Sequence, residues 1–301
     1  PYPTLFRSGD FDADGALEIA FLPWYELVIL DAATGKIKDR CRFTEGRSYG
    51  YFGVHDLDGD GKSEFVVEAD FSKHVDVLGY REGKLSVLWQ EAIETDISNP
   101  QKILHVNPNP VADLDGDGRN EVLVSLFNGD GNGRWHLVAH DGISGVVKAD
   151  VTDVYLEGVF DVEGDGVSDV LVTRATGAGV STTGGAAVYR FHDGKPVVAW
   201  EAPGMGWQTW SPPLPLNVST GATFGARTVL CRTIDGHAWA ALRKSEDGLA
   251  LAEWTPEGFQ TRCDVCGARL EALGISAEGG MLLRASYTPE EKTALHAVRG
   301  S

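Results

Sequence analysis

Four short acidic stretches share one pattern of oxygen-bearing side chains: DFDADGALE from Asp10, DLDGDGKSE from Asp56, DLDGDGRNE from Asp113 and DVEGDGVSD from Asp161. Each has carboxylates at positions one, three, five and nine, Gly at position six, and an apolar run directly after it. Alternate oxygen ligands in a tight loop, closed by a carboxylate on the next element, are how a short segment surrounds a hard cation such as Ca²⁺. Gly at position six supplies the backbone freedom that a sharp turn needs.

The acidity of the chain is concentrated in these loops. The formal net charge is −18, which argues against a nucleic-acid-binding groove. Bound divalent cations would cancel much of the loops' share, so the acidity is local ligand charge and not a diffuse acidic face. The loop carboxylates are Asp10, Asp12, Asp14, Glu18, Asp56, Asp58, Asp60, Glu64, Asp113, Asp115, Asp117, Glu121, Asp161, Glu163, Asp165 and Asp169.

The spacing of the loops indicates a repeat. Their first residues are 46, 57 and 48 positions apart, and a period near 50 with strand-like segments is typical of a propeller or a similar array. In the second repeat, four strands are predicted at SYGYFGVHDL, EFVVEAD, HVDVLGY and LSVLWQE. Alternating apolar residues and Gly-containing turns fit an antiparallel four-stranded blade. The acidic loop joins the first and second strands of each repeat, so we expect all four loops on one face.

The fold class we predict is all-β: a β-propeller of six four-stranded antiparallel blades, or seven if another segment supplies one. It forms a single domain over residues 1–301, which we take as a fragment or the mature part of a larger protein. The predicted blades are about 1–45, 46–95, 100–151, 152–203, 204–256 and 257–301. The first hairpin of the fifth blade, NVSTGATFG, has no carboxylate, so no calcium is expected there.

The repeats resemble the FG-GAP/VCBS family of calcium-binding β-propellers, related to the blades of integrin α-subunit heads. The match is to the D-x-D-x-D-G-x-x-[DE] loop at 10–18, 56–64, 113–121 and 161–169, with the strand that follows. The resemblance implies about four calcium ions, each held by the carboxylates at positions one, three, five and nine. It adds the position-seven carbonyls of Ala16, Lys62, Arg119 and Val167 as ligands. The fourth loop departs from the pattern because Glu163, with its longer side chain, stands at position three.

The four cysteines are too few for a disulfide scaffold. Cys263 and Cys266 form a C-x-x-C that we place in the first hairpin of the last blade. A short disulfide that staples this turn is the first hypothesis. A free, purely structural pair and a shared metal or redox site are the alternatives. Cys41 and Cys231 are expected to be buried and free.

The tryptophans divide into two sets. Trp89, Trp200 and Trp254 occupy the same place, at the end of the last strand of a blade, which predicts packing between blades. Trp207 and Trp210 do not repeat and precede SPPLPL in a blade without a calcium loop. They are the candidate exposed contact surface, with packing where the ring closes as the alternative.

No catalytic residue is predicted. The histidines are scattered without metal-ligand spacing, and His136 and His140 on one strand lie too far apart for one ion. The enzyme question stays open.

The function that the sequence favours is a calcium-stabilised propeller that binds a protein or a glycan as an adhesion module. The expected location is extracellular, at the cell surface or periplasmic, where millimolar calcium suits such loops. No membrane span and no nucleic-acid partner are expected, and self-association stays open. The alternatives are the propeller domain of a polysaccharide lyase or a lectin, and a structural subunit of an extracellular assembly.

Overall fold

The computed structural model describes residues 6–46, 48–69, 74–92, 102–105, 110–129, 131–180, 184–192, 194–208, 219–220, 230–232, 236–244, 248–266, 269–275, 281–286 and 293–298. All regular elements in these ranges are β-strands, so the all-β prediction is confirmed. The chain divides into two compact units, Pro1–Asp153 and Val154–Ser301. No described helix is long and apolar enough to cross a membrane.

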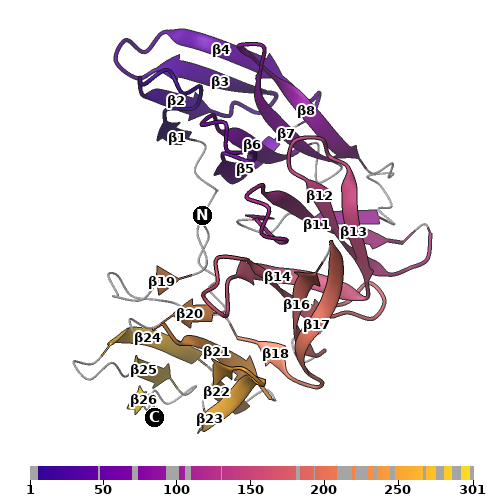
Figure 1. Ribbon diagram of the computed structural model, residues 1–301, viewed down its shortest axis with the longest axis vertical. Helices are drawn as coiled ribbons and strands as arrows, with labels where there is room; N and C mark the ends of the chain where they lie inside the picture. Colours follow the sequence, from indigo (N-terminus) through magenta and orange to yellow (C-terminus); the bar gives the residue numbers. More distant parts are fainter. Residues whose placement is uncertain are drawn as a thin grey trace. The chain divides into compact units, whose positions relative to one another are not determined.

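The first unit contains three antiparallel sheets whose strands follow one another along the chain (Figure 1). The strands of the first two sheets are β1 (Phe6–Gly9), β2 (Glu18–Phe21), β3 (Glu26–Asp31) and β4 (Ile37–Arg42), then β5 (Ser48–His55), β6 (Glu64–Ala69), β7 (His74–Arg81) and β8 (Lys84–Ala92). Those of the third are β9 (Lys102–His105), β10 (Val111–Ala112), β11 (Glu121–Asn128), β12 (Trp135–Asp141) and β13 (Val147–Thr152), where β9 and β10 both pair with β11.

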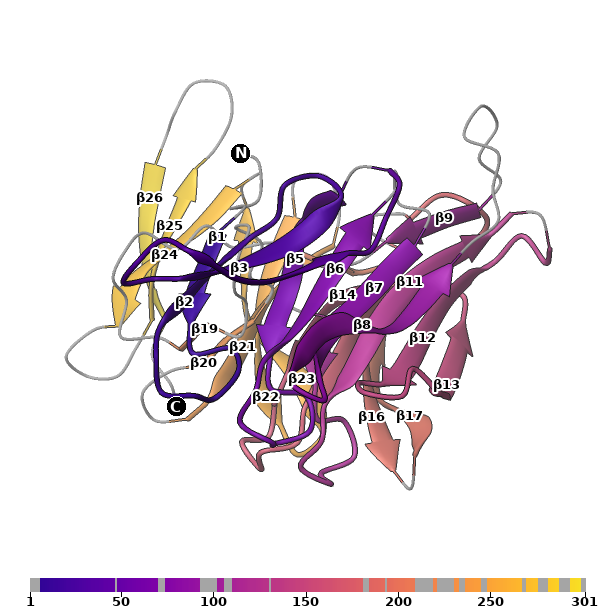
Figure 2. The same ribbon diagram turned by 90° about the horizontal axis from the view of Figure 1, so that it is seen from above.

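The three sheets of the first unit pack face to face. Phe65, Val67 and Leu78 of the β5–β8 sheet join Ala20 and Ile29 of the β1–β4 sheet in one buried cluster. The opposite face of the β5–β8 sheet joins the β10–β13 sheet in a second cluster of Leu57, Val66, Val75, Val77, Val111, Val122 and Val124. Strand β6 is therefore buried on both faces, which explains the consecutive apolar residues FVV at its centre. Figure 2 shows β6 to β8 beside β11 and β12.

The outer strand β4 of the first sheet is mostly polar, as expected of a sheet edge. In β4 (IKDRCR) the side chains are exposed or half-buried. Cys41 of this strand is free, as predicted, but it is half-buried where the sequence predicted a buried residue.

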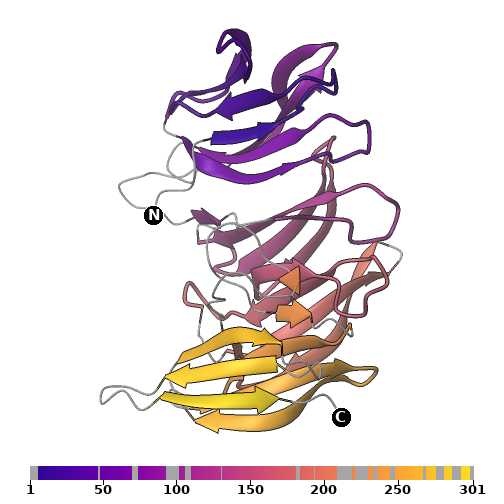
Figure 3. The same cartoon turned by 90° about the vertical axis from the view of Figure 1, so that its left-hand side faces the viewer.

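The second unit contains three further sheets. The first has the order β14-β15-β16-β17, the second runs from β19 to β23 with β18 against β21, and the third is β24-β25-β26, drawn in yellow in Figure 3. The strands are β14 (Val154–Phe160), β15 (Asp169–Arg174), β16 (Ala186–His192), β17 (Lys195–Ala202), β18 (Gly206–Trp207), β19 (Ser219–Thr220), β20 (Leu230–Arg232), β21 (Ala238–Arg243), β22 (Gly248–Thr255), β23 (Gly258–Cys266), β24 (Arg269–Ile275), β25 (Met281–Ser286) and β26 (Thr293–Val298).

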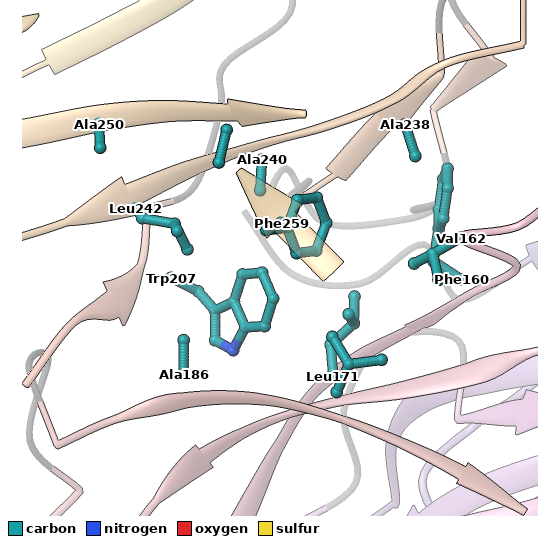
Figure 4. Close-up of a cluster of buried hydrophobic side chains, with 12 residues drawn as sticks. Phe160, Val162, Leu171, Ala186, Trp207, Ala238, Ala240, Leu242, Ala250 and Phe259 are labelled. Atoms are coloured by element: carbon teal, nitrogen blue, oxygen red, sulfur yellow. The ribbon is translucent and has the colours of Figure 1, made fainter. Parts of the chain in front are cut away.

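Trp207 lies in the core between two of these sheets and not on the surface. Its side chain is 8% exposed, within a cluster that combines Leu171 and Val188 with Leu242 (Figure 4). The indole N–H donates to the carbonyl of Val172 at 2.8 Å. The prediction of an exposed contact at Trp207 is therefore wrong, because the ring fills the space between facing sheets. Trp210 lies outside the described residues.

Trp89 and Trp200 pack as predicted where two sheets meet, whereas Trp254 lies on β22, which is not the last strand of its sheet. Trp89 of β8 contacts the cluster shared with the β10–β13 sheet and donates from its indole N–H to the carbonyl of Gly142 at 2.8 Å. Trp200 of β17 packs against Trp207 and Phe259 with ring centroids 5.9 and 5.2 Å apart. Trp254 of β22 makes an edge contact with Phe259.

The strand that carries Cys263 and Cys266 belongs to a different sheet from the one predicted. β23 pairs along its length with β22, whereas the sequence suggested that it begins the last blade. Both cysteines lie within the regular strand, paired with Leu251 and Gly248, and not in a hairpin. Three residues of extended strand span roughly 10 Å, beyond the Cα separation of a disulfide. The strand pairing thus gives no support to a stapled turn, and the state of the two thiols stays a prediction.

Trp207 provides a test of the packing between sheets. We expect Trp207→Ala to lower the free energy of unfolding by about 3–5 kcal/mol, because it leaves a cavity among buried side chains. Trp207→Phe keeps most of the packing but leaves the Val172 carbonyl without its donor, at a cost of about 1–3 kcal/mol. Urea unfolding followed by circular dichroism would measure both, with the exposed Val197→Ala as control. Equal, negligible effects of all three substitutions would contradict the core assignment.

Candidate metal centres

Each acidic loop joins the first and second strands of a sheet, as predicted. The loops lie between β1 and β2, β5 and β6, β10 and β11, and β14 and β15. The closing carboxylate at position nine begins the second strand and pairs with the last residue of the first strand: Gly9 with Glu18, His55 with Glu64, Ala112 with Glu121 and Phe160 with Asp169. The sheet register thus places the closing carboxylate at the mouth of its loop.

Backbone N–H groups within each loop orient the first carboxylate. In the second loop, Asp56 accepts hydrogen bonds from Gly59, Asp60 and Gly61 at 2.7, 3.1 and 2.9 Å. Gly61 stands at position six with φ of 88°, in the left-handed region where Gly is favoured. Asp113 of the third loop accepts from Gly116 and Gly118 in the same manner.

The closing carboxylates are almost completely buried. Glu18, Glu64, Glu121 and Asp169 are 0%, 4%, 1% and 2% exposed. One oxygen of each accepts the N–H of position two in its own loop, from Phe11, Leu57, Leu114 and Val162, at 2.8 to 3.0 Å. The second carboxylate oxygen needs its own compensation, because an uncompensated buried charge is costly.

Three of the four loops gather carboxylate oxygens within 4.8 Å of one another. The groups are Asp10, Asp12, Asp14 and Glu18; Asp56, Asp58 and Glu64; and Asp113, Asp115 and Glu121. An all-oxygen donor set fits a hard cation such as Ca²⁺. In the first loop, Oδ1 of Asp12 is buried without a hydrogen-bond partner, which also fits a ligand atom. Whether the position-seven carbonyls are ligands stays a prediction.

A lysine reaches into the first and third loops. Nζ of Lys38, on β4, lies 2.9, 2.6 and 2.9 Å from oxygens of Asp12, Asp14 and Glu18. The hydrogen bonds that Lys38 donates to Asp14, Glu18 and Asp12 raise the pKa of the lysine well above its usual range.

Lys148, on β13, makes the same arrangement in the third loop. Its Nζ lies 2.5 Å from Glu121 and 3.0 Å from Asp115. Burial lowers the pKa of Lys148, but hydrogen bonds to these two carboxylates outweigh it, so the net pKa is raised. Burial raises the pKa of Glu121, although the hydrogen bond from Lys148 lowers it.

The second loop differs in its charges. Lys62, at position seven, pairs with the exposed Asp60 at 2.6 Å, and among the described residues no lysine or arginine forms an ion pair with Glu64. Burial raises the pKa of Glu64 to about 7, and the charges of Asp58, Asp60 and Asp56 add to the effect. The second loop therefore carries the least compensated negative charge of the three groups.

The fourth loop has the turn but not the ligand group. Asp161 accepts from Asp165 and Gly166, yet the described carboxylates of this loop do not form a group like the other three. Arg190 of β16 pairs instead with Asp169 at 2.9 Å and Glu163 at 3.2 Å. The sequence analysis identified Glu163 as a departure from the loop pattern. The structure shows that Arg190 pairs with it.

Neighbouring loops of the first unit are hydrogen-bonded to each other. The N–H of Ser63, at position eight of the second loop, donates to the carbonyl of Phe11 at 3.0 Å. Asn120 holds the same position in the third loop, and its N–H donates to the carbonyl of Leu57 at 2.9 Å. Its side-chain amide donates to the carbonyl of Asp56 at 3.0 Å. The geometry of one loop is therefore coupled to that of the next.

Sequence reasoning missed Lys38, Lys148 and Arg190. A signal existed for the lysines, since each stands three residues after the Gly of a similar turn, Gly35 or Gly145. The turns themselves are alike, because Asp31 and Asp141 each accept the N–H of the residue three positions later. No comparable spacing indicates Arg190.

The structure also forms a hydrogen-bonded chain that the sequence did not suggest. Nδ1 of His74 lies 2.7 Å from Asp76, and Nε2 lies 3.5 Å from the hydroxyl of Thr44. Asp76 is fully buried and Thr44 is 6% exposed. Because Thr44 is buried, a substrate cannot reach its hydroxyl. These hydrogen bonds instead connect the β5–β8 sheet to the segment that precedes it. His136 and His140 have separate partners, Asp150 and the Gly145 carbonyl.

Comparisons with known proteins give no sequence relative. No family model and no curated protein matches the chain. Among solved structures, similar chains include the β-propeller domain of Myceliophteria thermophila Cps50 (Swd1), at 10% identity and a TM-score of 0.44, over 95% of this chain and 79% of that one. A putative 6-phosphogluconolactonase from Bacteroides fragilis matches at 11% identity and 0.44, over 96% and 83%. The Pseudomonas aeruginosa PilY1 C-terminal domain matches at 13% and 0.43, over 95% and 66%.

The raised pKa of Glu64 predicts a pH-dependent stability in the metal-free protein. A carboxyl whose pKa is about 7 when folded and 4.5 when unfolded stabilises the fold below pH 4.5 relative to higher pH. That advantage is lost as the pH rises to 7, by on the order of 3 kcal/mol. Glu64→Gln cannot ionise, so in chelator we expect it to melt above the wild type at pH 8 and close to it at pH 4.5. A pH series of thermal melts measures this, and a wild type that is the more stable at pH 8 would refute it.

Proposed function

We propose that this chain is a calcium-binding β-propeller domain of the FG-GAP/VCBS type. Its ions act structurally and its surface binds a protein or a glycan outside the cell or in the periplasm. The observation that carries the proposal is the repeated loop, which brings carboxylates of the first, second and third repeats within 4.8 Å of one another. Sheets of consecutive antiparallel strands that pack face to face within each unit support a propeller of six blades, or seven.

Calcium in these loops would neutralise clustered carboxylates and hold the turn between two strands. The residues that would hold it are those of the three groups, with the position-one Asp fixed by backbone N–H groups and the closing Glu anchored by the N–H of position two. Because Ser63 and Asn120 bond to the preceding loop, an ion in one loop also supports its neighbour.

Removal of calcium tests this proposal. At free calcium about ten times Kd, each site adds roughly 1.4 kcal/mol, so three sites supply about 4 kcal/mol. This corresponds to a rise in Tm on the order of 10 °C. We expect calcium analysis to find up to three ions per chain and the melt to fall by this amount in excess chelator. Asp113→Asn should lose one ion, whereas Glu45→Gln, on an exposed side chain outside the loops, should lose none. No bound calcium and no shift would refute calcium binding.

The turn between β2 and β3 favours a contact role for the surface. Trp24 is 49% exposed and has φ of 55°, a left-handed conformation that is uncommon for a bulky residue. Its ring makes an edge contact with Tyr25, and the guanidinium of Arg42 lies 5.6 Å from the Tyr25 ring centroid. Backbone strain at an exposed aromatic residue is a feature of binding sites.

Trp24→Gly separates binding from stability at this turn. Gly adopts positive φ without strain, so we expect an unchanged or slightly higher Tm. If the aromatic pair contacts the ligand, the same variant loses at least about tenfold in affinity on a glycan array or against a captured protein partner, since aromatic anchors carry much of an interface's energy. Val146→Ala, also exposed, is the control. Full binding by Trp24→Gly would exclude this turn.

A further inference from the structure

Two of the three carboxylate groups have a lysine ammonium in contact with their closing glutamate, and the third does not. The ammonium of Lys38 contacts three carboxylates of the first loop, and that of Lys148 contacts Glu121 and Asp115 of the third. These carboxylates are the candidate metal ligands themselves. A lysine and a calcium ion therefore compete for the same oxygens.

The two lysines occupy equivalent places in their sheets. Each is the extra residue of a β-bulge between the third and fourth strands. Leu30 pairs with Ile37 and Ile29 with Asp39, which leaves Lys38 between them. Likewise His140 pairs with Val147 and Ala139 with Ala149, which leaves Lys148. A bulge re-aims the side chain of the residue it inserts, here toward the loop at the end of the sheet.

The second loop has a leucine at the equivalent place. Leu78 pairs with Val87 and Val77 with Trp89, so Leu88 is the bulge residue of the β5–β8 sheet. The Leu88 side chain lies next to Glu64, since a Cβ added at Gly79 would meet Glu64 Cγ at 2.9 Å and Leu88 Cδ1 at 3.0 Å. An apolar residue there cannot supply the ammonium that Lys38 and Lys148 place against the closing glutamates of the other two loops, and Lys62 of the second loop pairs with Asp60 instead.

We propose that Lys38 and Lys148 are built-in counter-cations that hold the first and third loops closed without metal and weaken their calcium affinity, which leaves the second loop as the tight, metal-dependent site. This inference rests on the proposed calcium binding and adds an order of filling to it. Calcium enters the second loop first. In the first and third loops it enters only as the ammonium leaves, so those loops fill at higher calcium concentration.

The size of the effect follows from charge. A cation beside a carboxylate favours its ionised form by about one to three pKa units, equivalent to tenfold or more in the affinity for a competing proton. Ca²⁺ must displace the ammonium to reach the carboxylates, and the attraction between the ammonium and the carboxylates opposes that displacement. We therefore expect Lys38→Met and Lys148→Met, which keep the chain length and remove the charge, to tighten calcium binding in their own loops at least about tenfold.

The experiment is a calcium titration of the full chain by calorimetry. For the wild type we expect one tight ion and two weaker ones, with the tight class lost in Asp58→Asn. Lys38→Met and Lys148→Met should each convert one weak ion into a tight one and lower the Tm in chelator. Lys36→Met, on an exposed lysine of the same turn as Lys38, is the matched control and should change neither. Leu88→Lys should weaken the tight class at least about tenfold, whereas Leu88→Met should not.

A second measurement needs no variant. In chelator, the Nζ groups of Lys38 and Lys148 are engaged with carboxylates and should react more slowly than Lys36 with an amine-acylating reagent, as read by mass spectrometry. Saturating calcium should raise their labelling several-fold and leave that of Lys36 unchanged.

The outcomes separate this inference from the proposed function. Three equal calcium sites that are insensitive to the lysine substitutions, with labelling unaffected by calcium, would overturn the inference and leave calcium binding intact. No calcium binding by the wild type or any variant would refute the proposed function. Weak sites that tighten in the two methionine variants, or calcium-released labelling if those variants do not fold, would support the inference.

Discussion

Mutual repulsion within groups of carboxylates that each include one buried member is the constraint on which the described loops depend. In the first unit, each loop places three or four carboxylates within 4.8 Å of one another, and the closing glutamates are at most 4% exposed. Like charges at that separation repel, and burial of the closing glutamate removes the water that would screen its charge. The loop can keep this shape only if backbone N–H groups and a cation compensate the charge. The strands on either side are joined through this turn, so the sheet geometry depends on that compensation too.

The chain contains two means of compensation. One is internal: Lys38 in the first loop, Lys148 in the third and Arg190 in the fourth, each on a later strand of the same sheet as its loop. The other is a cation from solution, for which the second loop, with Leu88 in place of a lysine, has the greatest need. A β-bulge makes the first arrangement possible for the lysines, because it turns one side chain of an edge strand toward the end of the sheet.

Packing between sheets sets the remaining features. Strand β6 is buried on both faces, and Trp89 and Trp200 close the space where adjacent sheets meet. Trp207 follows the same rule: its indole N–H bonds to the Val172 carbonyl and its ring enters the core. A large ring with one polar atom suits such a place, because the ring fills volume while the N–H satisfies a backbone acceptor.

The sequence by itself determined the local features: the four turns, the strands that flank them, the place of the closing carboxylates and the packing role of Trp89 and Trp200. These depend on residues within a few positions of each other or on a repeat visible in the sequence. Only the tertiary structure decided which distant side chains meet. It brought Lys38 to Glu18, put β23 beside β22 and buried Trp207. The reason is physical: bulge register, strand pairing and sheet packing are set by the sum of long-range contacts, and no short stretch of sequence encodes them.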